Sequence, residues 1–311
     1  MERTPFSLES VAARSANYLE RLVDARGLPY FDVFWAGPSH AAHDWPDFGD
    51  VMSRQLQAAA MLRRMTGRRL AVEDTWRRLL LSYVDPADGL LYRPASAWSK
   101  READWGDAAL ALYALVTLAA DGDAEAGRAA AWMAAGLLAK ARSGDLPPTV
   151  FNGFIVKSLV ACARRVDDGA ALELARVIVK KVFEESSTFT ADDTFRHGGH
   201  MHGNLRTLVG AADYALLTGD AALLGRVDAL YRWVRTTGTR FGFLPEVIGR
   251  TGDVVACETC ALMDYAGLGA TLAHHGHPEY WGDLERLARN QYAESQLLDA
   301  AWLGGDDGRP D

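Results

Sequence analysis

Several residues with reactive side chains lie in one short segment, Ala256-Cys257-Glu258-Thr259-Cys260. An apolar run with helical spacing follows it, so we expect the segment to open a helix. At about 100° per residue, Cys257 and Cys260 share a helix face, whereas Glu258 can reach Cys260 only from an irregular first turn. Thiolates and a carboxylate suit zinc, and these three residues would supply part of its coordination shell. The alternative is a helix start with a capping acid and two buried thiols.

A second cluster, from Arg196 to Asn204, places three histidines before another expected helix. His200 and His202 cannot share a helical face, so the local chain must be extended or turned if both reach one ligand. Imidazoles in such a cluster can be metal ligands, partners of sugar hydroxyls or a proton relay. We expect His202, next to the helix start, to be catalytic, and His200 and Asn204 to bind substrate.

Candidate acids for catalysis lie in other connections. Glu246 stands in an otherwise apolar stretch, where desolvation would raise its pKa toward the range useful to a general acid. The alternative is a solvated loop residue. Paired-carboxylate chemistry needs a second acid. We expect it to be Asp44, with four other candidates at Asp104, Asp107, Asp192 and Asp193.

Helical hairpins are the elements that must position these residues. Five helical segments are each interrupted by a short polar turn and then resume, with spacings between turns of 55, 47, 50 and 57 residues. With a helix over residues 8–26, the pattern predicts eleven helices and little sheet. We expect an all-α, (α/α)6-barrel-like toroid, one helix short, in a single domain over residues 1–300 with a polar tail over 301–311. The turns carry Gly67, Gly122, Gly169, Gly219 and Gly276.

The long connections between hairpins should share one rim of such a barrel. They hold five of the eight histidines and four of the nine tryptophans. Aromatic faces stack on sugar rings, while imidazoles and carboxylates bind hydroxyl groups. This composition favours a sugar pocket over aromatics that merely plug the barrel mouth. The further substrate-binding residues that we expect are Trp35, His43, Trp45, Trp98 and Trp105.

The bulk composition restricts the partners of the chain. A net charge of -8 and a pI near 5.5 argue against nucleic acid or an anionic membrane as the main partner. No apolar run is long enough to span a bilayer, and the first residues lack the apolar core of a signal peptide, so we expect a cytoplasmic protein. Three cysteines in 311 residues do not make a disulfide framework.

The C-terminal third resembles the β-L-arabinofuranosidase family of glycoside hydrolases. The stretches that carry the resemblance are HGNLRTLVGAADYALLTGD, the helix around Trp233, LPEVIG and ETCALMDYAGLGATLAHHG, within residues 195–292. A weaker similarity lies in DFGDVMSRQLQAAAMLRRMTG. The resemblance implies an (α/α)6 barrel with a retaining hydrolase site. It also implies that Glu246 is the acid/base and that Glu258 and Cys260 are zinc ligands, and His202 resembles the family's His near a helix start.

The chain departs from this family in its cysteines. In the family a later cysteine pair completes the zinc site and provides the nucleophile, whereas no cysteine follows Cys260 here. The family's β-sandwich domain is also missing. We consider three explanations: a shortened relative with altered chemistry, a fragment of a larger protein, or a chain completed by a second copy or a partner chain. We expect Cys257, which forms C-x-x-C with Cys260, to offer a substitute zinc ligand, which is not a feature of the family.

These features together favour a carbohydrate-active enzyme that acts on a small carbohydrate or glycoside. The leading expectation is a glycoside hydrolase with Glu246 as general acid. One alternative is a lyase or unsaturated-uronide hydrolase on the same barrel, since these need only acids, His and Tyr. Another is a sugar-binding or scaffolding toroid without catalysis.

Overall fold

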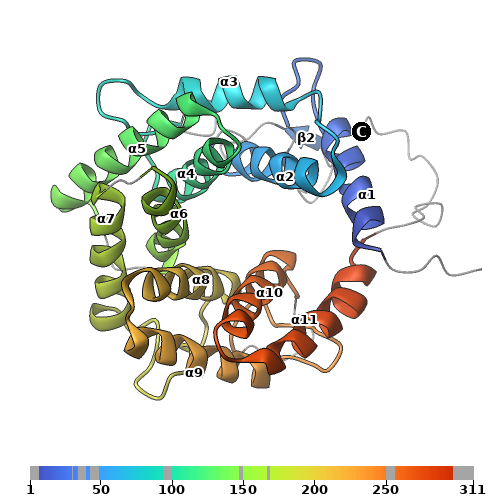
Figure 1. Ribbon diagram of the computed structural model, residues 1–311, viewed down its shortest axis with the longest axis vertical. Helices are drawn as coiled ribbons and strands as arrows, with labels where there is room; N and C mark the ends of the chain where they lie inside the picture. The colour runs from blue at the N-terminus through green and yellow to red at the C-terminus, as the bar shows by residue number, and fades with distance from the viewer. Residues whose placement is uncertain are drawn as a thin grey trace, which may run out of the picture. The chain divides into compact units, whose positions relative to one another are not determined.

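The computed structural model describes residues 7–29, 31–33, 40–42, 49–93, 95, 100–146, 150–166, 169–249 and 256–296. Within these ranges the chain forms eleven α-helices and one two-stranded sheet (Figure 1). This confirms the predicted all-α class and the low sheet content. In the same ranges, no helix has the length and apolar character that a membrane crossing would need.

The chain divides into two compact units. Of the described residues, unit 1 takes those within Met1–Ser143 and Ala161–Ala171, and unit 2 takes those within Gly144–Val160 and Leu172–Ala300. The expected single domain over residues 1–300 stays a prediction.

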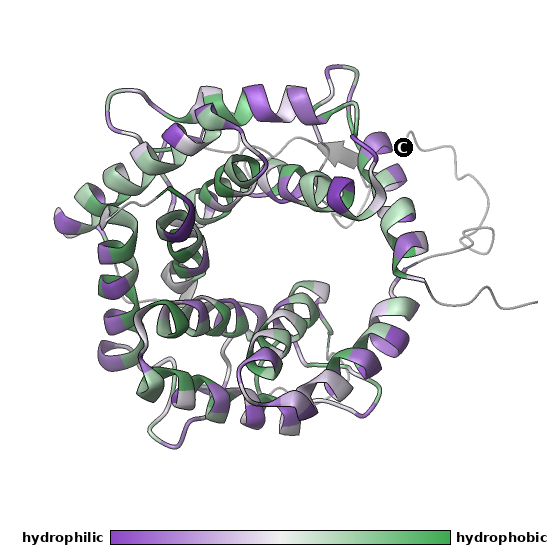
Figure 2. Ribbon diagram, viewed as in Figure 1, coloured by the Kyte–Doolittle hydropathy of each residue, from purple (hydrophilic) through white to green (hydrophobic). Residues whose placement is uncertain are grey.

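Unit 1 is built from two helical hairpins and a first helix. Its apolar residues lie where its helices face each other (Figure 2). α4 is buried on nearly every side, as expected for an apolar inner helix, and α2 packs against both α1 and α4. Its elements are α1 (Leu8–Arg21), β1 (Phe31–Val33) antiparallel to β2 (His40–Ala42), α2 (Val51–Thr66), α3 (Glu73–Tyr83), α4 (Trp105–Ala120), α5 (Ala124–Arg142) and the end of α6 (Val150–Val166).

The first helix is shorter than the sequence predicts, because α1 ends at Arg21 and not at residue 26. The side chain of Asp24 accepts hydrogen bonds from the backbone N–H groups of Arg26 and Leu28. A side chain that bonds the backbone in this way favours a turn over a continued helix.

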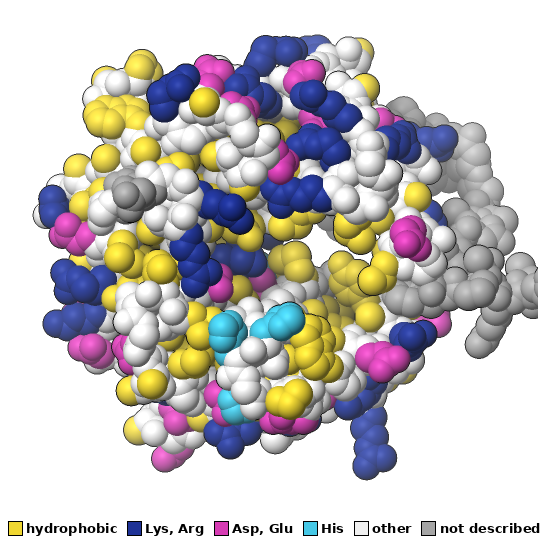
Figure 3. All heavy atoms as spheres, viewed as in Figure 1, with side chains coloured by type: hydrophobic (Ala, Val, Ile, Leu, Met, Phe, Trp, Pro, Cys, Tyr) yellow, Lys and Arg dark blue, Asp and Glu magenta, His cyan; other side chains and the backbone are white. Residues whose placement is uncertain are grey.

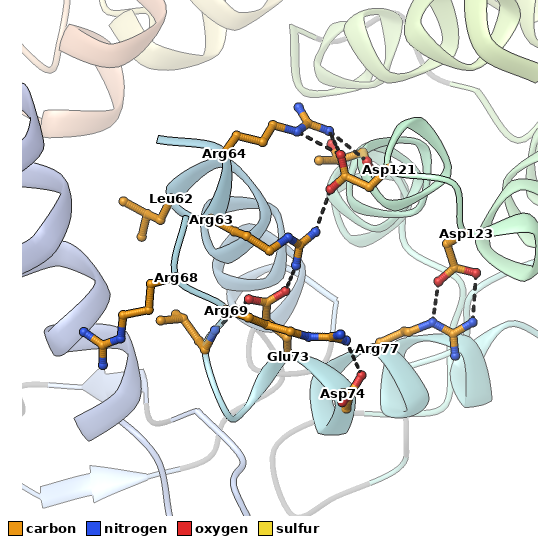
Figure 4. A network of polar contacts seen from close by, with 12 residues as sticks. Leu62, Arg63, Arg64, Arg68, Arg69, Glu73, Asp74, Arg77, Asp121 and Asp123 are labelled. Atoms are coloured by element: carbon orange, nitrogen blue, oxygen red, sulfur yellow. Dashed lines mark hydrogen bonds and ion pairs between the residues drawn. The ribbon is translucent and has the colours of Figure 1, made fainter. Parts of the chain in front are cut away.

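Ion pairs join the two hairpin turns of unit 1 (Figure 4). Arg63 on α2 contacts both Glu73, at the start of α3, and Asp121, in the α4–α5 turn. Arg77 on α3 pairs with Asp123, which also caps α5. Acidic and basic side chains mingle on the surface over the α2–α3 hairpin (Figure 3). Because Arg63 is forked between two acids, this network should be worth more than isolated surface pairs.

Unit 2 pairs α8 with α10 as its central helices, with α9 on α8 and α11 on α10. α6 approaches α8 very closely, since an added Cβ at Gly210 would lie 2.7 Å from the backbone nitrogen of Lys157. The predicted turn glycine Gly219 ends α8 in the left-handed conformation, with φ 74°. The elements are the start of α6, α7 (Gly169–Lys180) with a π turn (Lys181–Glu185), α8 (Met201–Thr218), α9 (Ala221–Thr237), α10 (Thr259–His274), a 3-10 turn (Pro278–Tyr280) and α11 (Trp281–Leu287) with a π turn (Ala288–Tyr292).

Candidate active site

The candidate active site lies in unit 2, where two helices begin. His200 directly precedes α8 and Glu258 directly precedes α10, both with extended backbone, and neither side chain caps its own helix. Instead, Nε2 of His200 lies 2.8 Å from Oε2 of Glu258. Two side chains at helix starts therefore contact each other and join α8 to α10.

Backbone hydrogen bonds bring a third segment to this point. The N–H of Met201 donates to the carbonyl of Glu246 over 2.8 Å, and the N–H of Ile248 donates to the carbonyl of Gly199 over 2.9 Å. The N–H of Glu246 in turn donates to the carbonyl of Ala256 over 2.9 Å. A short antiparallel pairing thus places Glu246 beside the start of α8, and the segment before α10 joins it.

Aromatic side chains hold the connection that leads into α8. Ring centroids are 4.8 Å apart for Phe183 and Phe189, 5.5 Å for Phe189 and Phe195, and 5.0 Å for Phe195 and Trp233. The series runs from the end of α7 through the connection to α9. It fixes the loop on the helices, so that the loop can present side chains in a set position.

The pKa values of the central pair shift in opposite directions. The hydrogen bond that His200 donates to Glu258 raises the pKa of His200, against the effect of burial, and the charge of Glu246 adds to the rise. The hydrogen bond from His200 lowers the pKa of Glu258, again against burial. Each shift favours the charged form of its group, so His200 keeps its proton to higher pH than a free histidine and Glu258 stays ionised to lower pH than a free glutamate.

His202 lies deeper than His200 and belongs to a buried polar cluster. Its side chain is 5% exposed, against 29% for His200, and the two ring centroids are 5.7 Å apart. Its Nδ1 is 2.9 Å from Oδ2 of Asp264, close enough for an ion pair but misaligned for a hydrogen bond. Phe154 packs edge-on against the ring, and Arg206 reaches the same carboxyl group. His200, and not His202, is therefore the more accessible of the two imidazoles.

The two cysteines lie beside the pair and have different surroundings. The thiol of Cys260 hydrogen-bonds Glu258, and burial raises the pKa of the half-buried Cys257 thiol. In the described part of the chain, no three His, Cys, Asp or Glu side chains are placed to hold a metal ion. In this arrangement Glu258 is shared by His200 and Cys260.

Asn204 and Trp105 are placed differently from what we expect of substrate-binding residues. Asn204 is buried, and its amide donates to the backbone carbonyl of His200 over 3.0 Å, so it supports the turn before α8. Trp105 is the first residue of α4 in unit 1, where it is buried with the Lys140 ammonium 5.9 Å from its ring centroid. Both side chains are buried in their units.

Three of the four other candidate carboxylates, Asp104, Asp107 and Asp193, have partners of their own. In unit 1, Asp104 caps α4, and buried Asp107 is bound by Arg93. In unit 2, Asp193 pairs with Arg226 of α9 over 3.1 Å, and its neighbour Asp192 is exposed. Five further expected site residues lie outside the described residues: Trp35, His43, Asp44, Trp45 and Trp98.

Sequence reasoning missed Arg206 and Asp264, which are buried behind the pair. Each is a charged residue inside an apolar helical run, Arg206 in LRTLVGAA and Asp264 in ALMDYAGL. A charge at such a position must have a buried partner, because an unpaired charge in the interior is too costly. That pattern is the signal that could have identified them.

Comparison with known proteins shows which fold the chain has. No family model matches the chain, and no curated protein matches it. Among solved structures it is similar to a cellobiose 2-epimerase from Bacillus thermoamylovorans B4167, with a TM-score of 0.66, 14% identity, and 96% of this chain and 90% of that chain covered. A sugar epimerase from a ruminal bacterium gives a TM-score of 0.68 at 12% identity, with 96% and 89% covered.

The resemblance seen in the sequence also has a structural counterpart. A GH127 β-L-arabinofuranosidase from Geobacillus stearothermophilus T6 matches with a TM-score of 0.63 and 16% identity, over 93% of this chain and 51% of that chain. The chain thus spans about half the length of that protein. Since identity is low throughout, these likenesses concern the fold. The chain has the (α/α)6-barrel-type fold of these structures, and it resembles the β-L-arabinofuranosidase in fold as well as in its sequence motifs.

Proposed function

We propose that the protein is a carbohydrate-active enzyme that transfers protons at a sugar with Glu246 and the His200–Glu258 pair. The observation that carries the proposal is the 2.8 Å contact between His200 and Glu258 beside the segment of Glu246. An acid, an imidazole and a second carboxylate at one point are the groups that general acid–base catalysis uses. The solved structures with this fold include a β-L-arabinofuranosidase and sugar epimerases.

Glycoside hydrolysis is the first candidate reaction. Glu246 would protonate the leaving oxygen, and Glu258, held ionised by His200, would be the second carboxylate. The Glu258 carboxylate would act as a base toward water or stabilise the positive charge that develops at the sugar. His200 would then orient Glu258 and keep its pKa low, which is the direction that their hydrogen bond imposes.

Sugar epimerisation is the second candidate, and two observations favour it. The epimerases match this chain over 90% and 89% of their own lengths, and His200 and His202 lie with ring centroids 5.7 Å apart. In this reaction a base removes the proton from the carbon beside the carbonyl of an open-chain sugar. The resulting enediolate then receives a proton on its opposite face from a second group.

Two assays on the same protein separate these reactions. A panel of aryl glycosides reports hydrolysis by release of the phenol. A panel of reducing sugars in D2O, followed by NMR, reports epimerisation by deuterium uptake beside the carbonyl. The active reaction should be lost in His200→Gln and kept in Glu294→Gln, an exposed glutamate of the same unit. Glu246→Gln should lose hydrolysis of glycosides of weakly acidic phenols, whose departure needs a proton. Sugar binding without either reaction would favour the non-catalytic alternative.

A further inference from the structure

A cavity in unit 2 lies apart from the His200–Glu258 pair. It has a volume of about 310 Å³ and is lined by the end of α9, by Tyr265 of α10, by α11 and by the connection over residues 238–244. α9, α10 and α11 are neighbours in unit 2 (Figure 1). The residues that line the cavity are Arg232, Arg235, Thr236, Gly238, Thr239, Gly242, Phe243, Leu244, Tyr265, Asp283, Arg286 and Leu287.

The charged residues of this lining are mostly basic. Three of them are Arg232, Arg235 and Arg286, and one is Asp283, so the lining carries three positive charges less one, a balance of +2. The whole chain has a net charge of -8. A local surplus of guanidinium groups in an acidic protein is a feature that attracts anions.

The arginines are held in place by acids that satisfy only part of their hydrogen-bonding capacity. Arg235 and Arg286 share the buried carboxyl group of Asp283, with N–O distances of 2.7 and 3.2 Å. Arg232 pairs over 3.0 Å with Asp228, which is not part of the lining. A guanidinium carries five N–H donors, so one carboxyl group shared by two arginines leaves donors for a ligand. Fixed guanidinium groups suit the fork geometry of carboxylate and phosphate.

The remaining walls give the ligand an apolar contact. Phe243, Leu244 and Leu287 contribute aliphatic and aromatic surface, and the ring of Tyr265 adds to it. Phe243 and Leu244 lie just before Glu246 in the chain. The volume suits a small molecule rather than a polymer.

The geometry points to a binding site for a small organic anion, a phosphate or carboxylate compound, in this cavity of Arg232, Arg235 and Arg286. The oxyanion group binds the guanidinium groups, and the body of the ligand packs on Phe243 and Leu244. Occupancy also fixes the connection that leads to Glu246. The inference does not depend on the reaction proposed for the other site.

Isothermal titration calorimetry tests this site with inorganic phosphate and with citrate, in buffers balanced with NaCl to equal ionic strength. The variant is Arg232→Gln/Arg286→Gln, which removes the two more exposed arginines and leaves Arg235 on Asp283. The control is Arg289→Gln, a side chain that is 59% exposed, pairs with Glu285 and does not line the cavity. We expect saturable binding of at least one probe by the wild type and the control, and binding at least about tenfold weaker in the double variant.

Each outcome of this titration decides the proposal. Binding of phosphate alone indicates phosphate compounds as ligands, and binding of citrate alone indicates carboxylates. No saturable binding of either probe by the wild type overturns the site, and so does equal binding by the wild type, the control and the double variant. If the double variant does not fold, Arg232→Gln alone leaves Asp283 with both of its arginines, and its weaker binding gives the same test.

Discussion

His200 and Glu258 are 58 positions apart in sequence, yet Nε2 and Oε2 of their side chains lie 2.8 Å apart at the starts of α8 and α10. Neither residue caps its own helix, and the two side chains bond each other instead, while Glu258 also bonds the thiol of Cys260. This arrangement gives the site a charge-paired imidazole whose protonation depends on the neighbouring acid. The coupling between the protonation of His200 and the charge of Glu258 has measurable consequences for stability and activity.

The pair should contribute most to stability in a defined pH window. The raised pKa of His200 gives stability that is fully present below its ordinary value of 6.5 and lost as pH rises through the folded-state value. The lowered pKa of Glu258 gives stability that is present above its ordinary value of 4.5 and lost as pH falls through the folded-state value. Between pH 4.5 and 6.5 both contributions are present.

Thermal melts test this window over about six pH units, from pH 3 to 9, which includes the ordinary pKa values of Glu and His. We expect Glu258→Gln to lose Tm relative to wild type mainly within the window, and Glu294→Gln to follow the wild type. A Glu258→Gln curve parallel to the wild-type curve at every pH would show that the pair has no such linkage.

Glu246→Gln should keep the fold and lower turnover by about 10²-fold or more on an unactivated glycoside, if Glu246 is the general acid of a hydrolase. A substrate whose leaving group needs no protonation should recover much of the rate. If Glu246 only binds a hydroxyl group, KM should rise and leaving-group acidity should have no effect. Full turnover of the variant on an unactivated glycoside would contradict the assignment.

Close packing of α6 on α8 predicts opposite effects for two glycine substitutions. An added Cβ at Gly210 would lie 2.7 Å from the backbone nitrogen of Lys157 and 2.8 Å from Cβ of Val156. Because a backbone atom cannot swing away, Gly210→Ala should cost about 1–3 kcal/mol of unfolding free energy. Gly225 in α9 has no neighbour within 4 Å of such a Cβ, so Gly225→Ala should gain up to about 1 kcal/mol. Chemical denaturation measures both, and a stabilised Gly210→Ala would contradict the packing.

Zinc remains an expectation from the sequence, and its nearest donors would be Cys260, Glu258 and Cys257. Elemental analysis of protein purified without chelator gives the zinc content of the wild type and of Cys260→Ser. Stoichiometric zinc that is lost in the variant would support a site there, formed by rearrangement of Glu258 away from His200. Stoichiometric zinc that is unchanged in the variant would rule out Cys260 as a ligand.

The helices and turns could be predicted because their signals are local. Helical spacing of apolar residues and the glycine at Gly219 are read from a few consecutive residues, and α8 and α9 follow them. The approach of Glu246 to the start of α8 could not be derived in this way. It depends on backbone bonds between connections that are far apart in sequence.

The roles of the two histidines could not be separated from the sequence either. His202 is the buried one because Asp264 on α10 and Phe154 on α6 pack around it. Neither neighbour is adjacent to it in sequence. Periodicity alone shows only that His200 and His202 point in different directions.

The pH dependence of kcat/KM for Glu258→Gln and wild type tests the central claim most directly, on whichever sugar substrate the panels identify. If protonated His200 serves the reaction, activity must fall as pH rises through its pKa, which the hydrogen bond to Glu258 raises. Loss of that carboxylate should therefore lower kcat/KM at every pH and also move the alkaline limb of the residual activity to lower pH, while Glu294→Gln leaves both unchanged. An alkaline limb at the same pH in Glu258→Gln and wild type would contradict the claim that this pair forms the catalytic site.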